Sequence, residues 1–349
     1  MATIPAYGTG GPEIPVAPMT IERRALRAED VDIEILYCGV CHSDLHQARN
    51  DWGSTQYPVV PGHEIVGIVR AVGPGVTKFA AGDRVAVGCL VDSCLTCEQC
   101  ADHQEQYCEK RATGTYNSRD RVDGSPTYGG YSASIVVREE FVLRVPEALD
   151  LARAAPLLCA GITTYSPLKH WKVGPGTKVG VVGLGGLGHM GVKLAAGLGA
   201  EVTMITTSPG KANDAHALGA DHVLVSTDKD AMKASARSFD FILNTVPVKH
   251  DIQPYLMLLK PGGTQVIVGA IDTLTLHSGQ LLAGRKQLSG SAIGGIKETQ
   301  ELLDFCAAKG IEPETETIAM ADINHAYERM ERSDVKYRFV IDMATLADA

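Results

Sequence analysis

The stretch Lys178–Gly191, KVGVVGLGGLGHMG, decides the fold of this chain. KVGVVG is apolar and β-branched, which is typical of a buried strand, and the glycine-rich turn after it leads into the helical pattern LGHMGVKLAAGL. A G-x-G-x-x-G turn between a strand and a helix indicates a dinucleotide-binding unit. Strand-like and helix-like segments keep alternating downstream. We therefore expect an α/β Rossmann domain with a doubly wound parallel sheet over residues 158–295.

The glycines of this turn predict how a dinucleotide would bind. Gly183 permits the tight turn, Gly185 lets the backbone approach a pyrophosphate, and Gly188 allows close contact between helix and strand. The helix N-terminus adds N–H groups and the positive end of its dipole. We predict that the whole turn binds the cofactor, Gly186 and Leu187 included. The alternative is a glycine-rich turn in a flavin-binding, other nucleotide-binding or empty doubly wound domain.

The end of the second strand favours NADP(H) over NAD(H). Selectivity for NAD requires an acidic residue about 20 residues after the glycines. The strand EVTMIT ends instead in Thr206, Thr207 and Ser208, and Lys211 follows closely. Hydroxyls and a cation suit a 2′-phosphate, which a carboxylate would repel. The alternative is that the hydroxyl residues only cap the next helix.

The composition is that of a folded, water-soluble chain. It has 349 residues, of which 45% are hydrophobic, and this length suggests two domains. The formal net charge is -9 and there is no Lys/Arg run, which argues against a nucleic-acid or membrane surface. We see neither a signal peptide nor an uninterrupted apolar span. We therefore expect a cytoplasmic protein with reduced thiols.

The regions on either side of the α/β segment show different residue patterns. Residues 1–157 contain strand-like segments such as VDIEILYC and DRVAVGCL, broken by the turn signals GPGV and AAGD. They predict an antiparallel β domain, such as a distorted barrel. Residues 296–349 add two helical patterns and the strand YRFVIDM beyond the six strands of the α/β domain. We expect this C-terminal segment to return to the first domain.

Closely spaced cysteines predict a structural metal site in the loop 94–108. They are separated by x2, x2 and x7, and they are Cys94, Cys97, Cys100 and Cys108. Four thiolates satisfy Zn²⁺ tetrahedrally and leave no open position. In the competing iron–sulfur motif the fourth cysteine follows x3 and precedes proline, whereas Cys108 precedes Glu109. A reducing compartment disfavours disulfides, and a redox CxxC needs a βαβ context. Cys89 is expected to be a buried bystander.

A second group of possible ligands is scattered along the chain as Cys41, His63, Glu64 and Cys159. Taken singly, each could be an ordinary core or loop residue. Their surroundings are more telling: CGVCHSDLH, VPGHEIVG and PLLCAGITTY. Together with the cysteine loop, GLGGLGH, GSAIGG before KET, and KYRFVID, they resemble the zinc-containing medium-chain alcohol dehydrogenases. The resemblance runs nearly end to end and is to the cinnamyl-alcohol-dehydrogenase-like branch, with its bacterial NADPH-dependent aldehyde reductases.

The resemblance implies a GroES-like catalytic domain at residues 1–157 and a catalytic zinc within it. Cys41, His63 and Cys159 would bind this zinc and leave a fourth position for substrate or water. Glu64 would be an outer or transient ligand. Asp44 would hydrogen-bond His63 and orient its ring, as carboxylates do for metal-bound histidines.

The resemblance also implies roles for residues near the substrate and the cofactor. Ser43 would be the hydroxyl nearest the substrate oxygen, and His46 would end a proton relay to solvent. His42 and Arg338 would approach the cofactor phosphates, and Thr163 would be a further cofactor contact. The alternative for Ser43 is that it caps the short helix beginning there.

The implied activity is hydride transfer between NADP(H) and primary alcohols or aldehydes, with one catalytic and one structural Zn²⁺ per chain. Zinc would act as a Lewis acid on the substrate oxygen. Plant monolignol enzymes usually carry Trp where this chain reads RATGTYN, and Phe at Ala292, so we expect a broader range of aromatic and aliphatic aldehydes. A homodimer joined through the sixth strands is also implied.

Two alternatives remain. A zinc-free quinone reductase of the same superfamily would lack Cys41 and Cys159. A non-catalytic, zinc-stapled nucleotide-binding or sensor protein would need only the loop cysteines and the glycines.

Overall fold

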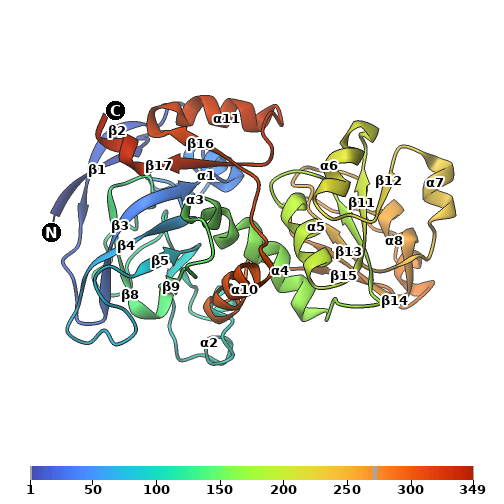
Figure 1. Ribbon diagram of the computed structural model, residues 1–349, viewed down its shortest axis with the longest axis horizontal. Helices are drawn as coiled ribbons and strands as arrows, with labels where there is room; N and C mark the ends of the chain where they lie inside the picture. Colours follow the sequence, from blue (N-terminus) through green and yellow to red (C-terminus); the bar gives the residue numbers. More distant parts are fainter. Residues whose placement is uncertain (1, 270–272, 349) are drawn as a thin grey trace. The chain divides into compact units, whose positions relative to one another are not determined.

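The chain folds into two compact units, seen in a computed structural model that describes residues 2–269 and 273–348 (Figure 1). Unit 1 comprises Met1–Cys159 and Gly294–Ala349, and unit 2 comprises Ala160–Ile293. The expected limits of the α/β domain, 158 and 295, fall just outside unit 2. Both residues at these limits pack in unit 1: Leu158 is 1% exposed, and a Cβ on Gly295 would lie 1.8 Å from the carbonyl oxygen of His103.

Unit 2 is built on a six-stranded sheet in the order β12-β11-β10-β13-β14-β15. Every neighbouring pair is parallel. The strands are β10 (Lys178–Val182), β11 (Glu201–Thr206), β12 (His222–Val225), β13 (Phe239–Asn244), β14 (Leu259–Ile267) and β15 (Gln287–Gly290). The order reverses between β10 and β13, which is where doubly wound sheets bind their ligands. This confirms the predicted Rossmann architecture.

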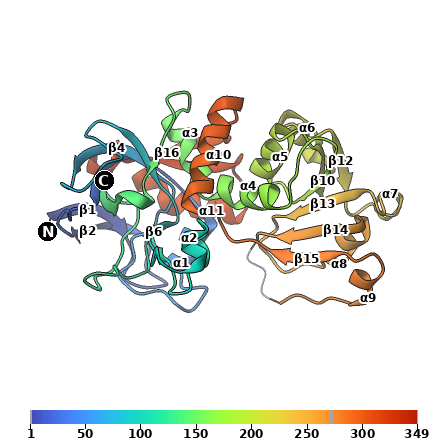
Figure 2. The same cartoon turned by 90° about the horizontal axis from the view of Figure 1, so that it is seen from below.

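Helices connect these strands and enclose an apolar core. They are α4 (Ala160–His170), α5 (Gly188–Gly197), η4 (Pro209–Lys211), α6 (Ala212–Ala217), α7 (Lys229–Ala234), α8 (Gln253–Leu258) and α9 (Gly279–Leu282). Val182, Ile205, Ile242 and Leu256 form the centre of one buried cluster between strands and helices. Figure 2 shows β13, β14 and β15 side by side, with α8 next to them.

Unit 1 is dominated by a seven-stranded sheet in the order β16-β17-β3-β4-β5-β9, with β8 also pairing with β3. Smaller pairs join β1 to β2 and β6 to β7. The strands of the N-terminal part are β1 (Ala2–Gly8), β2 (Ala17–Arg23), β3 (Asp30–Gly39), β4 (Ile65–Val72), β5 (Arg84–Val87), β6 (Leu90–Asp92), β7 (Thr113–Gly114), β8 (Ser134–Arg138) and β9 (Leu143–Arg144). All of these pair antiparallel, as predicted.

Short helices of unit 1 interrupt this β structure. They are α1 (His42–Ala48), α2 (Glu98–Ala101), η1 (Glu105–Tyr107), η2 (Glu139–Phe141), α3 (Leu151–Ala154) and η3 (Ala155–Leu158). The loop of closely spaced cysteines lies between β6 and β7 and contains α2 and η1. Among the helices that the structure describes in either unit, none is long and apolar enough to cross a membrane.

The C-terminal segment completes the large sheet of unit 1. It consists of α10 (Ile296–Lys309), β16 (Thr315–Ala319), η5 (Met320–Asp322), α11 (Ile323–Glu331), β17 (Arg338–Asp342) and η6 (Met343–Asp348). α10 ends at Gly310, whose φ of 64° favours glycine. β17 pairs antiparallel with β3, with Val340 opposite Gly39. In Figure 1 the red strand β17 accordingly lies beside the blue strand β3. The Val40 amide donates to the carbonyl oxygen of Phe339, which brings the start of β17 close to the residues that follow β3.

Candidate active site and metal centres

The loop between β6 and β7 holds the first group of metal ligands, which we call the loop set: Cys94, Cys97, Cys100 and Cys108. The four Sγ atoms lie within 4.8 Å of one another, and those of Cys94 and Cys100 are 3.9 Å apart. Thiolates bound tetrahedrally to zinc at about 2.3 Å would lie about 3.8 Å from each other. The arrangement therefore fits a closed zinc site with four sulfur ligands.

Backbone amides of the loop favour the thiolate form of two of its cysteines, Cys94 and Cys97, whereas burial raises the pKa of Cys100 to about 12. The N–H groups of Thr96 and Cys97 lower the pKa of the Cys94 thiol to about 5. Cys97 N lies 3.4 Å from Cys94 Sγ, and Cys94 N lies 3.4 Å from Cys108 Sγ. The thiolate is the form that binds metal. The loop thus supplies the donor set and the hydrogen bonds that such a site needs.

The second group, which we call the core set, comprises Cys41, His63, Glu64 and Cys159. Their donor atoms lie within 4.8 Å of one another, and all four residues are buried. The Sγ atoms of Cys41 and Cys159 are 3.9 Å apart, again a tetrahedral separation. The hydrogen bond from Cys159 holds the pKa of Cys41 well below its usual value. Three separate segments meet here: the start of α1, the residues before β4, and the end of η3.

Asp44 links two of these segments. It is fully buried, and its Oδ1 lies 3.1 Å from His63 Nδ1 and 3.0 Å from the Gly62 amide, while Oδ2 accepts from the Cys41 amide at 2.8 Å. A carboxylate can only accept, so Nδ1 carries the proton and Nε2 is left for a metal. Burial lowers the pKa of His63, but the Asp44 carboxylate outweighs it and holds that pKa well above its usual value. Metal binding at Nε2 therefore releases a proton.

Glu64 brings a carboxylate and a buried ion pair into the core set. Its Oε1 accepts a hydrogen bond from Arg338, whereas its Oε2 is buried and has no partner among the described residues. Burial raises the pKa of Glu64 to about 7. A Cβ on Gly39 would lie 1.9 Å from Oε2, so only glycine fits there. One carboxylate oxygen thus remains available inside the ligand group, which suits an outer or transient ligand.

Arg338 is 5% exposed, and the ion pair with Glu64 engages its guanidinium. This contact lies within unit 1. Burial opposes the charge of Arg338, but the Glu64 carboxylate more than compensates and raises its pKa. A contact of Arg338 with cofactor phosphates remains a prediction.

Helix α1 carries the predicted relay residues. Its N-cap is Cys41, with Asp44 at N3, so the alternative that Ser43 caps the helix is wrong. Ser43 lies half-buried in the first turn. No hydrogen bond between described residues joins it to His46, and the relay therefore remains a prediction.

Two half-buried histidines of this helix are followed by an acidic residue just beyond its end. The His46 ring lies 5.5 Å from that of Trp52 and 6.2 Å from that of His42, and His46 Nδ1 is 2.7 Å from Asp51 Oδ2. Trp52 is 48% exposed. Sequence reasoning missed Asp51, although an acidic residue five positions after a predicted relay histidine is a usable signal.

Two further residues next to the core set were not predicted. The Tyr116 ring centroid lies 5.6 Å from that of His63. Cys89 is half-buried, and its hydrogen bond with Cys159 lowers its pKa. Its Sγ also lies 3.7 Å from the carbonyl oxygen of Leu158. Cys89 is not a member of either ligand group, as expected of a bystander, but it is only half-buried and contacts the ligand residue Cys159.

The glycine-rich turn of unit 2 has the form expected of a dinucleotide cradle. Gly183 has a φ of 91°, and a Cβ on Gly188 would lie 1.8 Å from the Gly183 carbonyl oxygen. Gly185 is exposed, and nothing lies within 4 Å of where its Cβ would be. The peptide N–H groups at the start of α5 follow directly. The turn therefore leaves open space beside its backbone, where a pyrophosphate could approach.

The residues after β11 lie close to this turn. Lys211 Nζ donates to the carbonyl oxygen of Leu184 at 3.0 Å, which ties the two segments together. Thr206 is buried and Thr207 is exposed. Ser208 precedes η4 without any side-chain capping bond, so the capping alternative has no support. Thr163 is buried in α4, and its cofactor contact remains a prediction.

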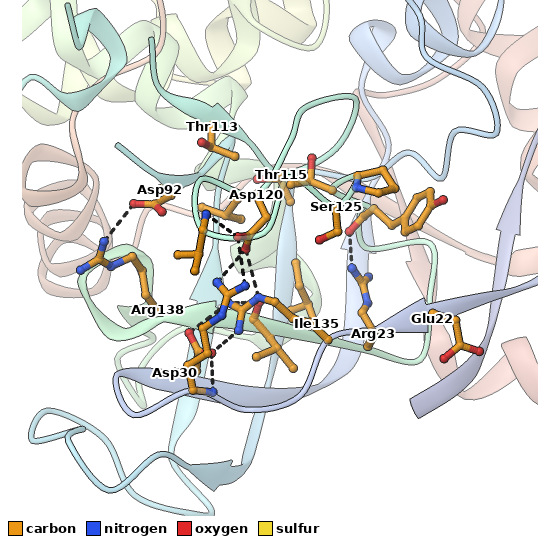
Figure 3. Close-up of a pocket in the computed structure, with 18 of the residues that line it drawn as sticks. Glu22, Arg23, Asp30, Asp92, Thr113, Thr115, Asp120, Ser125, Ile135 and Arg138 are labelled. Atoms are coloured by element: carbon orange, nitrogen blue, oxygen red, sulfur yellow. Dashed lines mark hydrogen bonds and ion pairs between the residues drawn. The ribbon is translucent and has the colours of Figure 1, made fainter. Parts of the chain in front are cut away.

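A charged cavity of about 320 Å³ lies elsewhere in unit 1 (Figure 3). Three arginines on its wall each pair with acids: Arg24 with Asp30, Arg27 with Asp120, and Arg138 with Asp92. Arg23 donates to three backbone carbonyls and the Ser132 hydroxyl. Because the guanidinium groups of all four arginines are already bonded, we interpret the lining of this cavity as a network of ion pairs that supports the fold. It lies at the base of the cysteine loop, where β6 ends and β7 begins.

A dinucleotide-type sheet in one unit and two zinc-type ligand groups in the other define the class of zinc-binding dehydrogenases. Comparison with known proteins agrees. Residues 27–147 match the family described as alcohol dehydrogenase GroES-like domain, and residues 186–308 match the family described as zinc-binding dehydrogenase. The chain belongs to the zinc-binding alcohol dehydrogenases with a GroES-like domain.

Similar proteins span the whole chain. Aldehyde reductase YahK of Escherichia coli is 56% identical over 99% of both chains. A cinnamyl alcohol dehydrogenase structure from Sorghum bicolor is 47% identical, with a TM-score of 0.95 over 98% of both chains. A cinnamyl alcohol dehydrogenase from Helicobacter pylori, solved with NADP(H), is 43% identical, with a TM-score of 0.92 over 98% of this chain and 99% of that one.

Proposed function

We propose that this chain is a zinc-dependent oxidoreductase that interconverts aldehydes and primary alcohols with NADP(H). The observation that carries the proposal is the core set, because a catalytic zinc needs three protein ligands and one free position. Cys41, His63 and Cys159 provide these ligands in one buried cluster. Similarity to an aldehyde reductase and to an alcohol dehydrogenase solved with NADP(H) supports the same activity. A sensor protein would need only the loop set.

Zn²⁺ bound by the core set would supply Lewis-acid polarisation of a carbonyl oxygen. The chain's own residues prepare that position. Asp44 fixes the tautomer and the orientation of His63, and the Arg338 guanidinium balances the charge of Glu64. The free Oε2 of Glu64 offers an outer or transient ligand on the same side of the cluster.

Reduction of an aldehyde also requires a proton, which we assign to α1. Ser43 lies two residues after the ligand Cys41 and would pass the proton to the substrate oxygen. His46 would supply it, since an imidazole can both take up and give a proton. Asp51 holds Nδ1 of His46 and leaves Nε2 free to exchange a proton.

The cofactor would bind at the turn of unit 2 and supply the reducing equivalents. The residues at the end of β11 favour the phosphorylated form, because Thr206, Thr207 and Ser208 offer hydroxyls and no carboxylate. Lys211 already contacts the carbonyl of Leu184 in the glycine-rich turn and adds positive charge. His42, Thr163 and Arg338 would complete the contacts.

The loop set would hold a second zinc that braces its loop and takes no part in the reaction. Four cysteines leave no position for substrate. On this assignment residues 1–159 with 294–349 form the catalytic unit, and residues 160–293 form the cofactor unit.

Substrate range, assembly and location form the finer part of the proposal. RATGTYN lacks a tryptophan and Ala292 is small, which suits aromatic and aliphatic aldehydes of the benzyl and cinnamyl type. β15 ends its sheet, and pairing with a second copy would satisfy its free backbone groups in a homodimer. None of the nine cysteines, which all lie among the described residues, forms a disulfide, and this suits a reducing cytoplasm. Light scattering of the purified protein tests the dimer.

The activity is tested by mixing the protein with NADPH and benzaldehyde and following the absorbance of the reduced nicotinamide. Parallel assays with NADH and with cinnamaldehyde and butanal map cofactor and substrate. We expect reduction with NADPH and its loss after a chelator has removed zinc, with recovery when zinc is returned. Reduction at full rate after both zinc ions are gone would overturn the proposal. So would a zinc- and NADPH-bound protein that reduces none of these aldehydes.

A further inference from the structure

Two buried tyrosines extend the contact between Asp44 and His63 away from the metal ligands. The Tyr131 hydroxyl lies 3.4 Å from Asp44 Oδ2, and the Tyr327 hydroxyl lies 3.5 Å from that of Tyr131. The two residues are 0% and 4% exposed. Tyr131 precedes β8, whereas Tyr327 belongs to α11 in the C-terminal segment. The chain of contacts thus reaches the core set from two distant parts of unit 1.

The hydrogen bonds that join Tyr327, Tyr131 and Asp44 can run in only one direction, with each hydroxyl donating toward Asp44. Asp44 has no proton to give, so the Tyr131 hydroxyl donates to it and can accept from Tyr327. Asp44 then accepts from the amides of Cys41 and Gly62, the His63 ring and Tyr131, and the Tyr116 hydroxyl also bonds its carboxylate. Its two oxygens are thereby fixed in position, and a buried carboxylate satisfied in this way holds its partners rigidly.

Tyr131 also confines the backbone of the residue before His63. Gly62 has a φ of 101°, and a Cβ there would lie 2.8 Å from Cδ1 of the Tyr131 ring. The ring therefore limits the path of the ligand loop, and the hydroxyl holds the carboxylate that orients the ligand. A phenylalanine would keep the first function and remove the second.

The two hydroxyls remain donors at neutral pH. Burial, together with the nearby Asp44 carboxylate, raises the pKa of both phenols well above the usual value. Burying a hydroxyl without a hydrogen-bond partner costs free energy, so each of these hydroxyls stabilises the fold only when it is hydrogen-bonded.

We propose that Tyr131 and Tyr327 are positioning residues that hold Asp44, and through it the His63 ring, for the metal of the core set. This inference rests on the proposed function. Neither tyrosine reaches the core ligands by itself. Each acts through the next member of the series Tyr327, Tyr131, Asp44 and His63.

The test compares zinc loss from the wild-type protein with zinc loss from Tyr131→Phe, Tyr327→Phe and the double variant. A colorimetric zinc chelator is added to each holoenzyme, and the two zinc ions are counted as they are released. We expect Tyr131→Phe to weaken zinc retention at the core set about 10-fold, in the range seen when outer hydrogen-bond partners are removed. Tyr327→Phe should have a smaller effect. The loop zinc serves as an internal reference and should leave at an unchanged rate.

The double variant is the decisive member of the series. If the chain runs through Tyr131, removing the Tyr327 hydroxyl in the Tyr131→Phe background should add nothing, because the connection is already broken. Tyr7→Phe is the matched control, since Tyr7 is buried in the same unit and its hydroxyl bonds to none of the described residues. It should lose zinc as the wild type does.

The outcomes separate this inference from the proposed function. A wild-type protein that binds zinc at the loop alone overturns both. If the wild type binds two zinc ions and Tyr131→Phe releases its core zinc at the wild-type rate, only the positioning role is overturned. Additive effects of the two substitutions in the double variant would overturn it as well. If Tyr131→Phe does not fold, the test rests on Tyr327→Phe alone. A core zinc that Tyr327→Phe holds as tightly as the wild type would then overturn the proposed positioning role. A changed visible spectrum of Co²⁺ in the core set of Tyr131→Phe, absent from Tyr7→Phe, supports it.

Discussion

The loop set and the core set of unit 1 both offer zinc-type ligands, but they differ in the segments that supply these ligands and in the residues around them. The loop set takes four sulfurs from one short loop, with backbone N–H groups as their partners. The core set takes two sulfurs, an imidazole and a carboxylate from three segments, and adds Asp44 and Arg338 around them. The first arrangement is closed by its ligands. The second holds an oriented histidine and a carboxylate oxygen with no hydrogen-bond partner in the described part of the chain. On the proposed assignment, the number of thiolates is a poor guide to where the reaction takes place.

Removing a core ligand should have the largest effect. We expect Cys41→Ala to bind one zinc instead of two and to lose aldehyde reduction by about 1,000-fold or more, since Lewis-acid stabilisation is worth several kcal/mol. NADPH should still bind, as measured by fluorescence, because the glycine turn lies in unit 2. Cys306→Ala is the control, a buried cysteine of α10 outside both sets, and should keep both zinc ions and the activity. Full activity in Cys41→Ala would contradict the assignment of the core set as the catalytic zinc site.

Removing a loop ligand should act on stability instead. Cys97→Ala should also bind one zinc, but at the core set. Losing the metal that braces the loop should cost about 3 kcal/mol and lower Tm by roughly 5–10 °C. Calorimetry measures the shift, and activity per core zinc should stay within about twofold of wild type because the loop contributes nothing to the Lewis acid. A loss of turnover as large as that of Cys41→Ala at a temperature where the variant is folded would contradict the structural assignment.

A change at the cofactor turn should alter activity without touching either zinc. Thr207→Asp places a carboxylate just after β11, where it would repel a 2′-phosphate and could accept from a ribose hydroxyl. We expect kcat/KM for NADPH to fall about 10- to 100-fold, equivalent to about 1.4–2.8 kcal/mol, and the preference to move toward NADH. Thr207→Asn is the control of matched size without charge and should retain NADPH. A zinc count below two in either variant would mean that the sets are not independent of unit 2.

The sequence reveals local features of this molecule better than distant ones. The alternation of strands and helices and the glycine turn identify the Rossmann sheet, and the cysteine spacing identifies the loop set, because each pattern is complete within one short segment. No periodicity joins Cys41 to Cys159, which are 118 residues apart, and only family resemblance suggests that they meet. The Arg338–Glu64 pair spans 274 residues, and the contact of Tyr327 with Tyr131 spans 196. Such contacts depend on how β17 and α11 pack, which no local signal specifies.

The charged cavity beneath the loop offers the smallest and most specific test. Asp120 is partly buried, which raises its pKa, but hydrogen bonds from Arg27 and from the Val122 and Asp123 amides together outweigh this and lower it below its ordinary 3.8. The native carboxylate therefore stays ionised to a lower pH than the unfolded one. The pair stabilises the fold above the unfolded pKa, and this contribution is lost as the pH falls through the native pKa.

Asp120→Asn should consequently lose about 1 kcal/mol at neutral pH, since the pair is partly screened by solvent, and lower Tm by about 2 °C. The difference from wild type should shrink as the pH falls below about 4. Zinc content and aldehyde reduction should stay at wild-type values, because the network supports the base of the loop and does not touch the core set. A Tm difference that is unchanged at acid pH would show that packing, and not the charge of Asp120, explains the loss. A drop in turnover at neutral pH would mean that the loop region contributes to the reaction after all.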